Sequence, residues 1–96
     1  MRLAFIALST LAAAAPSLAA APTIEAQLAS PADGRIITRS GAWACTDAGC
    51  TTRSAESRPA VMCELLAKEA GRIETFAVDG VAFDADKLAK CNRKAR

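Results

Sequence analysis

The sequence predicts an α+β fold, a small antiparallel sheet with two short helices that is stapled by disulfides. Segments of alternating apolar and polar residues are separated by turns that contain Gly and Pro, which is typical of antiparallel strands. Two other segments have helical periodicity with recognisable first and last turns. Four cysteines in a chain of 96 residues match the disulfide-rich class of small exported proteins.

The first residues have the features of a secretory signal peptide. Arg2 supplies a positive charge, and residues 3–15 form an uncharged, largely apolar run that leads into small residues. Ser17 and Ala19 occupy the two small-residue positions that precede cleavage, which places the cut after Ala19. An Ala-rich buried helix is the alternative, but it explains neither the early charge nor the small residues at the end.

We therefore expect residues 1–19 to be a signal peptide and residues 20–96 to form a single exported domain, periplasmic or secreted. The apolar run is too short for a membrane span, and we expect no transmembrane segment in residues 20–96. A domain this small obtains only about 3–5 kcal/mol from its core. Because the chain has one Trp, three Phe and no Tyr, disulfides are expected to supply much of the remaining stability.

Four strands are expected in the first half of the domain, over residues 22–28, 35–38, 42–46 and 50–53. The first of these segments alternates apolar with polar residues, as a half-buried strand does. Turns or breaks are marked by Gly34, Gly41 and Gly49. The last of these turns is short, so the third and fourth segments are expected to form a hairpin.

The first helix is expected between Pro59, which suits a first helical turn, and Gly71, which suits the position just past the end. Apolar residues four apart share one face of this segment: Met62, Leu66 and Ala70. The start remains open between two positions. Ser57 is the better capping residue, yet Arg58 precedes a proline and therefore resists helical geometry.

A second hairpin is expected after the first helix. Residues 72–78 alternate and predict a strand, and residues 81–83 predict its return. Between them, Asp79 and Gly80 form the dipeptide that most strongly indicates a two-residue hairpin turn.

The chain is expected to end in a second, shorter helix with Asp84 as its N-cap. Phe83 and Leu88 have the spacing of a hydrophobic staple across this cap. Basic residues in the later turns complement the negative end of the helix dipole: Lys87, Lys90, Arg93 and Lys94.

Four cysteines allow three disulfide connectivities: Cys45, Cys50, Cys63 and Cys91. Hairpin geometry favours a Cys45–Cys50 bridge across adjacent strands, and this leaves Cys63 with Cys91. The second bridge would pin both helices to one side of the sheet. Loop entropy does not distinguish this arrangement from Cys45–Cys63 with Cys50–Cys91, because both constrain the unfolded chain to a similar extent.

Three motifs carry a resemblance to a known family. They are W-x-C-x4-C over residues 43–50, R-P-x3-C over 58–63 and L-A-x-C-N over 88–92. Together they resemble an uncharacterised family of small bacterial proteins with signal peptides. The resemblance covers about residues 40–93 and leaves 20–39 outside it. It implies secretion and a four-cysteine frame, and it implies no activity, substrate or partner.

The sequence predicts no catalytic residues, no metal site and no cofactor. It contains no histidine, so Ser-His-Asp and Cys-His catalytic arrangements are impossible. Zinc sites use closely paired cysteines or cysteines mixed with histidine, whereas Cys63 and Cys91 are widely separated. Asp84 and Asp86 are paired carboxylates, but acidic residues are common where a helix begins. We therefore expect that the protein is not an enzyme.

Two features could contact other molecules. The basic C-terminus predicts a solvated helix end, with weak contact to an anionic surface as the functional alternative. Nucleic acid is not an expected partner, because the domain is exported and no aromatic residues lie near this tail. For Trp43 we favour a core anchor beside a disulfide, and the alternative is an exposed contact for an unknown protein partner.

Three functions remain as hypotheses. The leading one is a non-enzymatic exported protein that serves as a binding or accessory module, through a sheet edge or through Trp43. The second is an inhibitor of an exported enzyme, which predicts a protruding loop at residues 47–49. The third is a small thiol-redox protein, which predicts an accessible Cys45–Cys50 bridge.

Overall fold

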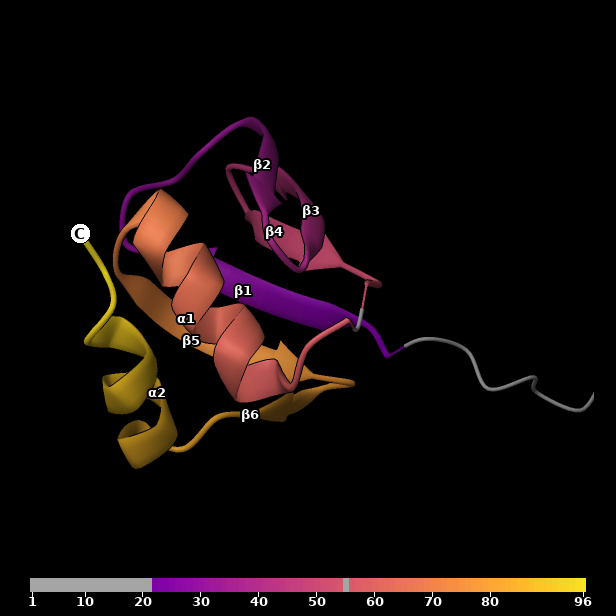
Figure 1. Ribbon diagram of the computed structural model, residues 1–96. Helices are drawn as coiled ribbons and strands as arrows, with labels where there is room; N and C mark the ends of the chain where they lie inside the picture. The colour runs from indigo at the N-terminus through magenta and orange to yellow at the C-terminus, as the bar shows by residue number, and fades with distance from the viewer. Residues whose placement is uncertain (1–21, 55) are drawn as a thin grey trace, which may run out of the picture.

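The computed structural model describes residues 22–54 and 56–96, and the expected leader at 1–19 lies outside these residues (Figure 1). The described chain forms one six-stranded sheet and two helices, which confirms the predicted α+β class. Along the chain the elements are β1 (Ile24–Leu28), β2 (Gly34–Thr38), β3 (Gly41–Thr46), β4 (Gly49–Thr52), α1 (Pro59–Ala70), β5 (Ile73–Val78), β6 (Val81–Ala82) and α2 (Ala85–Asn92).

The sheet has the order β2-β3-β4-β1-β5-β6, and all of its neighbouring strands are antiparallel. β1 lies inside the sheet, where it joins the strands before α1 to the hairpin after it. Ile24 is paired with Thr52 of β4 on one side and with Val78 of β5 on the other. β1 therefore lies between two strands that are distant from it in sequence.

Three of the six strands begin at glycines that the sequence assigned to turns or breaks. Gly34, Gly41 and Gly49 are the first residues of β2, β3 and β4, because backbone pairing starts directly at each turn. The second hairpin has the expected turn. Asp79 and Gly80 have φ values of 50° and 83°, and positive φ at both central residues is what a type I′ turn requires.

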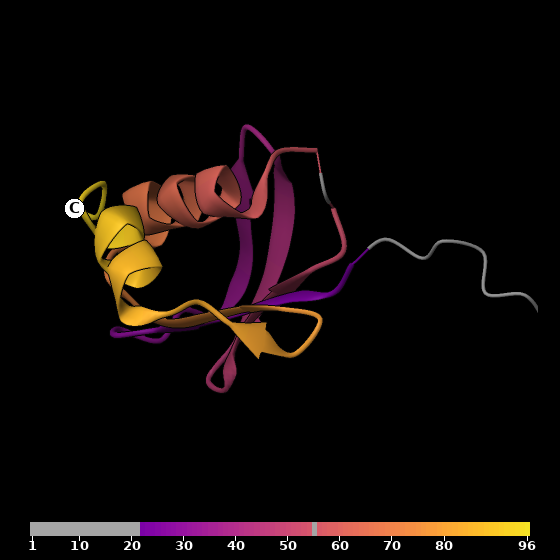
Figure 2. The same ribbon diagram turned by 90° about the horizontal axis from the view of Figure 1, so that it is seen from below.

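Both helices lie on the same face of the sheet, with α1 over the strands and α2 beside it (Figure 2). α1 begins at Pro59 with Arg58 as its N-cap residue, and no side chain makes a capping hydrogen bond there. The hydroxyl of Ser57 instead pairs with the hydroxyl of Ser40 in the β2–β3 turn. At the other end, Gly71 donates its N–H to the Ala67 carbonyl at 2.8 Å, as expected for the residue past a helix end.

The core lies between the two helices and the inner face of the sheet. Its largest fully buried side chains are Trp43, Phe76, Ile24, Met62, Leu66 and Ile73. The three rings of Trp43, Phe76 and Phe83 follow one another, with centroids 6.0 Å and then 4.7 Å apart. Such tilted ring pairs add to the stabilisation from burial alone, so Trp43 is a structural centre of the domain.

Candidate functional site

The candidate site is a groove of about 590 Å³ between the start of α1, the β5–β6 hairpin and α2. We call this the α1–β6–α2 groove. In Figure 1 the elements β6 and α2 lie in the lower left part of the molecule, with α1 above them. A volume of this size is within the range of small-ligand and peptide-anchor sites, and most of the exposed lining is apolar.

The hairpin supplies the apolar wall of the groove. Val78 and Val81 are directly paired across β5 and β6, so their side chains lie on the same face of the sheet. Phe83 follows on this face and packs against the core. Val81 is 71% exposed, and Ile37 is the other large apolar side chain that is exposed among the described residues. Val81 therefore presents apolar surface directly to whatever occupies the groove.

Positive charge surrounds this apolar wall. Lys87 and Lys90 are three residues apart on α2, so they share one helix face, and both line the groove. Arg58 lines it from the start of α1, and Glu64 is the carboxylate in the lining. The ammonium of Lys87 lies 5.7 Å from the centroid of the Phe83 ring, which holds this cation over the apolar wall.

The first turn of α2 is fixed by its own N-cap residue, Asp84. A carboxylate oxygen of Asp84 accepts a hydrogen bond from the backbone N–H of Lys87 at 2.8 Å, which confirms the predicted N-cap. The Cys63–Cys91 disulfide ties α2 to α1, and Cys91 lies in the wall of the groove at 2% exposure. The shape of the groove therefore depends on the cap and on this disulfide.

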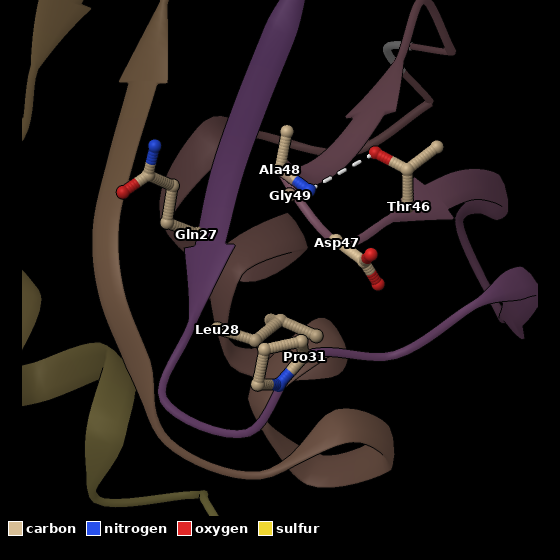
Figure 3. A pocket seen from close by; sticks show the side chains of 7 residues that line it. All are labelled: Gln27, Leu28, Pro31, Thr46, Asp47, Ala48 and Gly49. Carbon is tan, nitrogen blue, oxygen red and sulfur yellow. Dashed lines mark hydrogen bonds between the residues drawn. The ribbon is translucent and has the colours of Figure 1, made fainter.

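A second hollow, of about 270 Å³, lies between the end of β1 and the tip of the β3–β4 hairpin (Figure 3). Asp47 and Ala48 form the exposed turn at this tip, which protrudes from the sheet (Figure 2). The hydroxyl of Thr46 accepts the Ala48 N–H at 3.2 Å and braces the turn. Leu28 and Pro31 form the opposite side.

The cysteine pairing favoured from the hairpin geometry is confirmed. Cys45 is bonded to Cys50 across β3 and β4, and Cys63 is bonded to Cys91. The first bridge is buried, with Cys45 4% and Cys50 1% exposed. This burial differs from the accessible bridge that the thiol-redox hypothesis expects.

Trp43 is 1% exposed and lies in the core on the same strand face as Cys45. This position agrees with the favoured interpretation of Trp43 as a core anchor, and it leaves the indole no exposed surface for contact with a partner. Sequence reasoning did not find the groove. The sequence assigns Lys87 and Lys90 to a basic helix end that complements the helix dipole or contacts an anionic surface, and it assigns Val81 to a strand. Nothing local indicates that these residues line the same groove.

A family model matches residues 6–93, which is most of the chain. The chain belongs to DUF8200, a family of unknown function. The match extends upstream of the span that the motifs indicated and includes residues 20–39, so the expectation that these lie outside the family is wrong. No curated protein and no solved structure matches the chain.

Two further properties of the described residues concern membrane-spanning helices and metal sites. Within residues 22–54 and 56–96, neither helix is long and apolar enough to cross a membrane. In the same residues, no group of three or more His, Cys, Asp or Glu side chains is arranged to hold a metal ion.

Proposed function

We propose that this protein is a non-enzymatic, exported binding module that takes up part of another protein in the α1–β6–α2 groove. The observation that carries the proposal is the exposed apolar wall around Val81, which is bordered by two helices that a disulfide joins. Exposed apolar surface in a concave, rigid setting is a common feature of protein interaction sites.

Two further features support a non-enzymatic, exported role. The sequence has no histidine, which removes the most common general acid–base residue. Two buried disulfides are typical of proteins that fold in an oxidising compartment, as the N-terminal leader pattern also indicates. The proposed location is therefore the periplasm or the cell exterior.

The test uses the two exposed apolar side chains as a matched pair. Val81 lies in the groove, whereas Ile37 lies on β2 and is exposed to a similar degree. The oxidised protein and its Val81→Glu and Ile37→Glu variants serve as baits in an envelope extract, and captured proteins are quantified by mass spectrometry. We expect a partner that Val81→Glu loses and Ile37→Glu retains. A partner lost equally in both variants, or the absence of any partner, would contradict the proposal.

Inhibition of an exported enzyme is the second candidate, and the β3–β4 tip favours it. The β3–β4 turn protrudes from the sheet (Figure 2), and its residues Asp47 and Ala48 are exposed. The Cys45–Cys50 disulfide closes a short ring around this turn and restricts its shape. A preorganised loop binds with a smaller entropy loss. Assays with a panel of exported hydrolases would test this candidate, with Asp47→Lys expected to abolish inhibition and Val81→Glu to leave it unchanged. Failure of the wild-type protein to inhibit any of them would remove the candidate for that panel.

A further inference from the structure

We infer that the segment bound in the α1–β6–α2 groove is an extended acidic peptide that pairs with the edge of β6. This inference rests on the proposed function, because it specifies the chemistry of the partner of the same groove. Three independent features support it: the backbone edge of β6, the charge around the groove and the uncapped start of α1.

β6 is the last strand in the sheet order, so its outer edge has no neighbouring strand among the described residues. Val81 is paired with Val78, and the Phe83 N–H donates to the Phe76 carbonyl at 2.7 Å. Because hydrogen-bonding directions alternate along an antiparallel strand, the N–H and C=O of Ala82 point away from β5. Ala82 is exposed and lines the groove, so it offers one donor and one acceptor to an added strand.

An added strand would also place side chains against the apolar wall. Side chains alternate between the two faces of a strand, so every second residue of the partner would face the side that Val81 and Phe83 occupy. Apolar residues at those positions would cover the exposed surface of Val81. The pattern expected of the partner is therefore apolar residues alternating with polar ones.

The charges in the lining determine the sign of those polar residues. Arg58, Lys87 and Lys90 are all exposed, whereas Glu64 is half-buried and is the single carboxylate among the residues that line the groove. Complementary charge steers association and disfavours partners of the wrong sign. The groove therefore selects an anionic segment over a cationic one.

The start of α1 adds a further reason for carboxylates. Among the described residues, no side chain caps this helix, and its first turn contains no acidic residue. A helix start with unpaired N–H groups favours a negative charge. Pro59 and Ala60 of this turn line the groove, so a partner carboxylate would find both the helix start and Arg58 there.

In the test, each of three synthetic peptides is titrated into the oxidised protein. Binding is measured by the NMR chemical shifts of the Ala82 and Phe83 amides and by calorimetry. One peptide alternates Val with Glu, the second replaces each Glu by Lys, and the third replaces each Glu by Gln. We expect the acidic peptide to bind about tenfold or more tightly than the basic one, with a preference that weakens as salt is added. Equal affinities for the acidic and basic peptides would overturn the inference.

Charge reversal on α2 provides a matched control. The Lys87→Glu/Lys90→Glu variant is expected to reverse the preference, so that the basic peptide binds more tightly than the acidic one. Arg93→Glu/Lys94→Glu makes the same change in net charge outside the groove and is expected to preserve the preference. If both double variants have the same effect, overall charge rather than the groove determines binding, and the inference fails.

Ala82 tests the strand pairing. Ala82→Pro removes the outward-pointing N–H but no hydrogen bond to β5, and proline is tolerated at such edge positions. Ala82→Val is the control, because valine retains the backbone N–H. We expect Ala82→Pro to weaken the acidic peptide about tenfold or more and Ala82→Val to have little effect. Equal affinities of these variants would overturn the strand addition.

Anionic phosphatidylglycerol vesicles provide the competing outcome. Binding to these vesicles that depends on Lys87 and Lys90 but not on the Ala82 N–H, without peptide binding, would assign the groove to a lipid surface instead. A natural partner that Val81→Glu loses, combined with no preference among the three peptides, would leave the proposed function standing and reject only the acidic-strand inference.

Discussion

The side-chain amide of Asn92 makes two hydrogen bonds to the backbone of Ile73. The Ile73 N–H donates to Oδ1 of Asn92 at 2.8 Å, and Nδ2 of Asn92 donates to the Ile73 carbonyl at 2.8 Å. The amide thus pairs with the first residue of β5 as a neighbouring strand would, and it joins the last turn of α2 to the sheet one residue after Cys91.

We expect Asn92→Asp and Asn92→Leu to lower the free energy of unfolding by about 1–3 kcal/mol. Aspartate retains the acceptor but places a carboxylate oxygen against the Ile73 carbonyl, and leucine leaves both backbone groups without their partner. Urea unfolding measures the change. Arg93→Ala, at the exposed neighbouring position, serves as the control and should change stability by no more than about 0.5 kcal/mol. Wild-type stability in both Asn92 variants would show that water replaces the amide at no cost.

The two disulfides are expected to contribute unequally. The Cys63–Cys91 bridge closes a long loop with a sequence separation of 28, and Cys45–Cys50 closes a short one with a separation of 5. In the loop-entropy model these correspond to about 3.5 and about 2 kcal/mol. Cys63→Ser should therefore lower the melting temperature more than Cys45→Ser. Equal shifts in thermal unfolding would mean that strain or residual structure, rather than loop length, dominates.

Gly49 occupies a position that no other residue fits. Its φ is +135°, and an added Cβ would lie 2.6 Å from the carbonyl oxygen of Ala26 in β1. Gly49→Ala should therefore cost the backbone strain of about 1–3 kcal/mol and, in addition, a displacement of β1 or β4. Gly34→Ala is the matched control, because Gly34 has a φ of +101° with nothing within 4 Å of an added Cβ. Chemical denaturation should rank the Gly49 variant clearly below the Gly34 variant, and the reverse order would refute this account.

The N-cap of α2 is expected to contribute more than a second acidic residue in the same turn. Asp84 accepts the Lys87 N–H, whereas Asp86 only adds negative charge near the helix start. Asp84→Ala should cost about 1 kcal/mol, and Asp86→Ala less. Hydrogen exchange of the Lys87 amide provides a direct measurement, with faster exchange expected in the Asp84 variant alone. Equal acceleration in both variants would show that charge, not the cap, protects this amide.

Features set by neighbouring residues were predictable from the sequence. The Asp79–Gly80 turn, the Asp84 cap and the end of α1 before Gly71 all match the structure, because each depends on interactions within a few residues. Turn geometry at Gly49 likewise places Cys45 opposite Cys50, which accounts for the correct pairing.

Features that join distant segments could not be predicted in this way. No local signal indicates that β1 lies between β4 and β5, or that Asn92 pairs with Ile73 across 19 residues. The groove is a further example, because it combines residues 58–64, 78–83 and 87–91. Strand order and the packing of helices depend on how the whole chain buries its apolar surface.

The sequence alone thus determined the fold class, the secondary structure and the four-cysteine frame, since backbone propensities and turn chemistry act over short distances. Only the tertiary structure decided between the two interpretations of Trp43, which is buried, and brought the exposed Val81 into the same groove as Lys87. Exposure depends on which surfaces meet: Trp43 packs against Phe76 within the core, whereas β6 is the last strand of the sheet and its outer edge is open among the described residues.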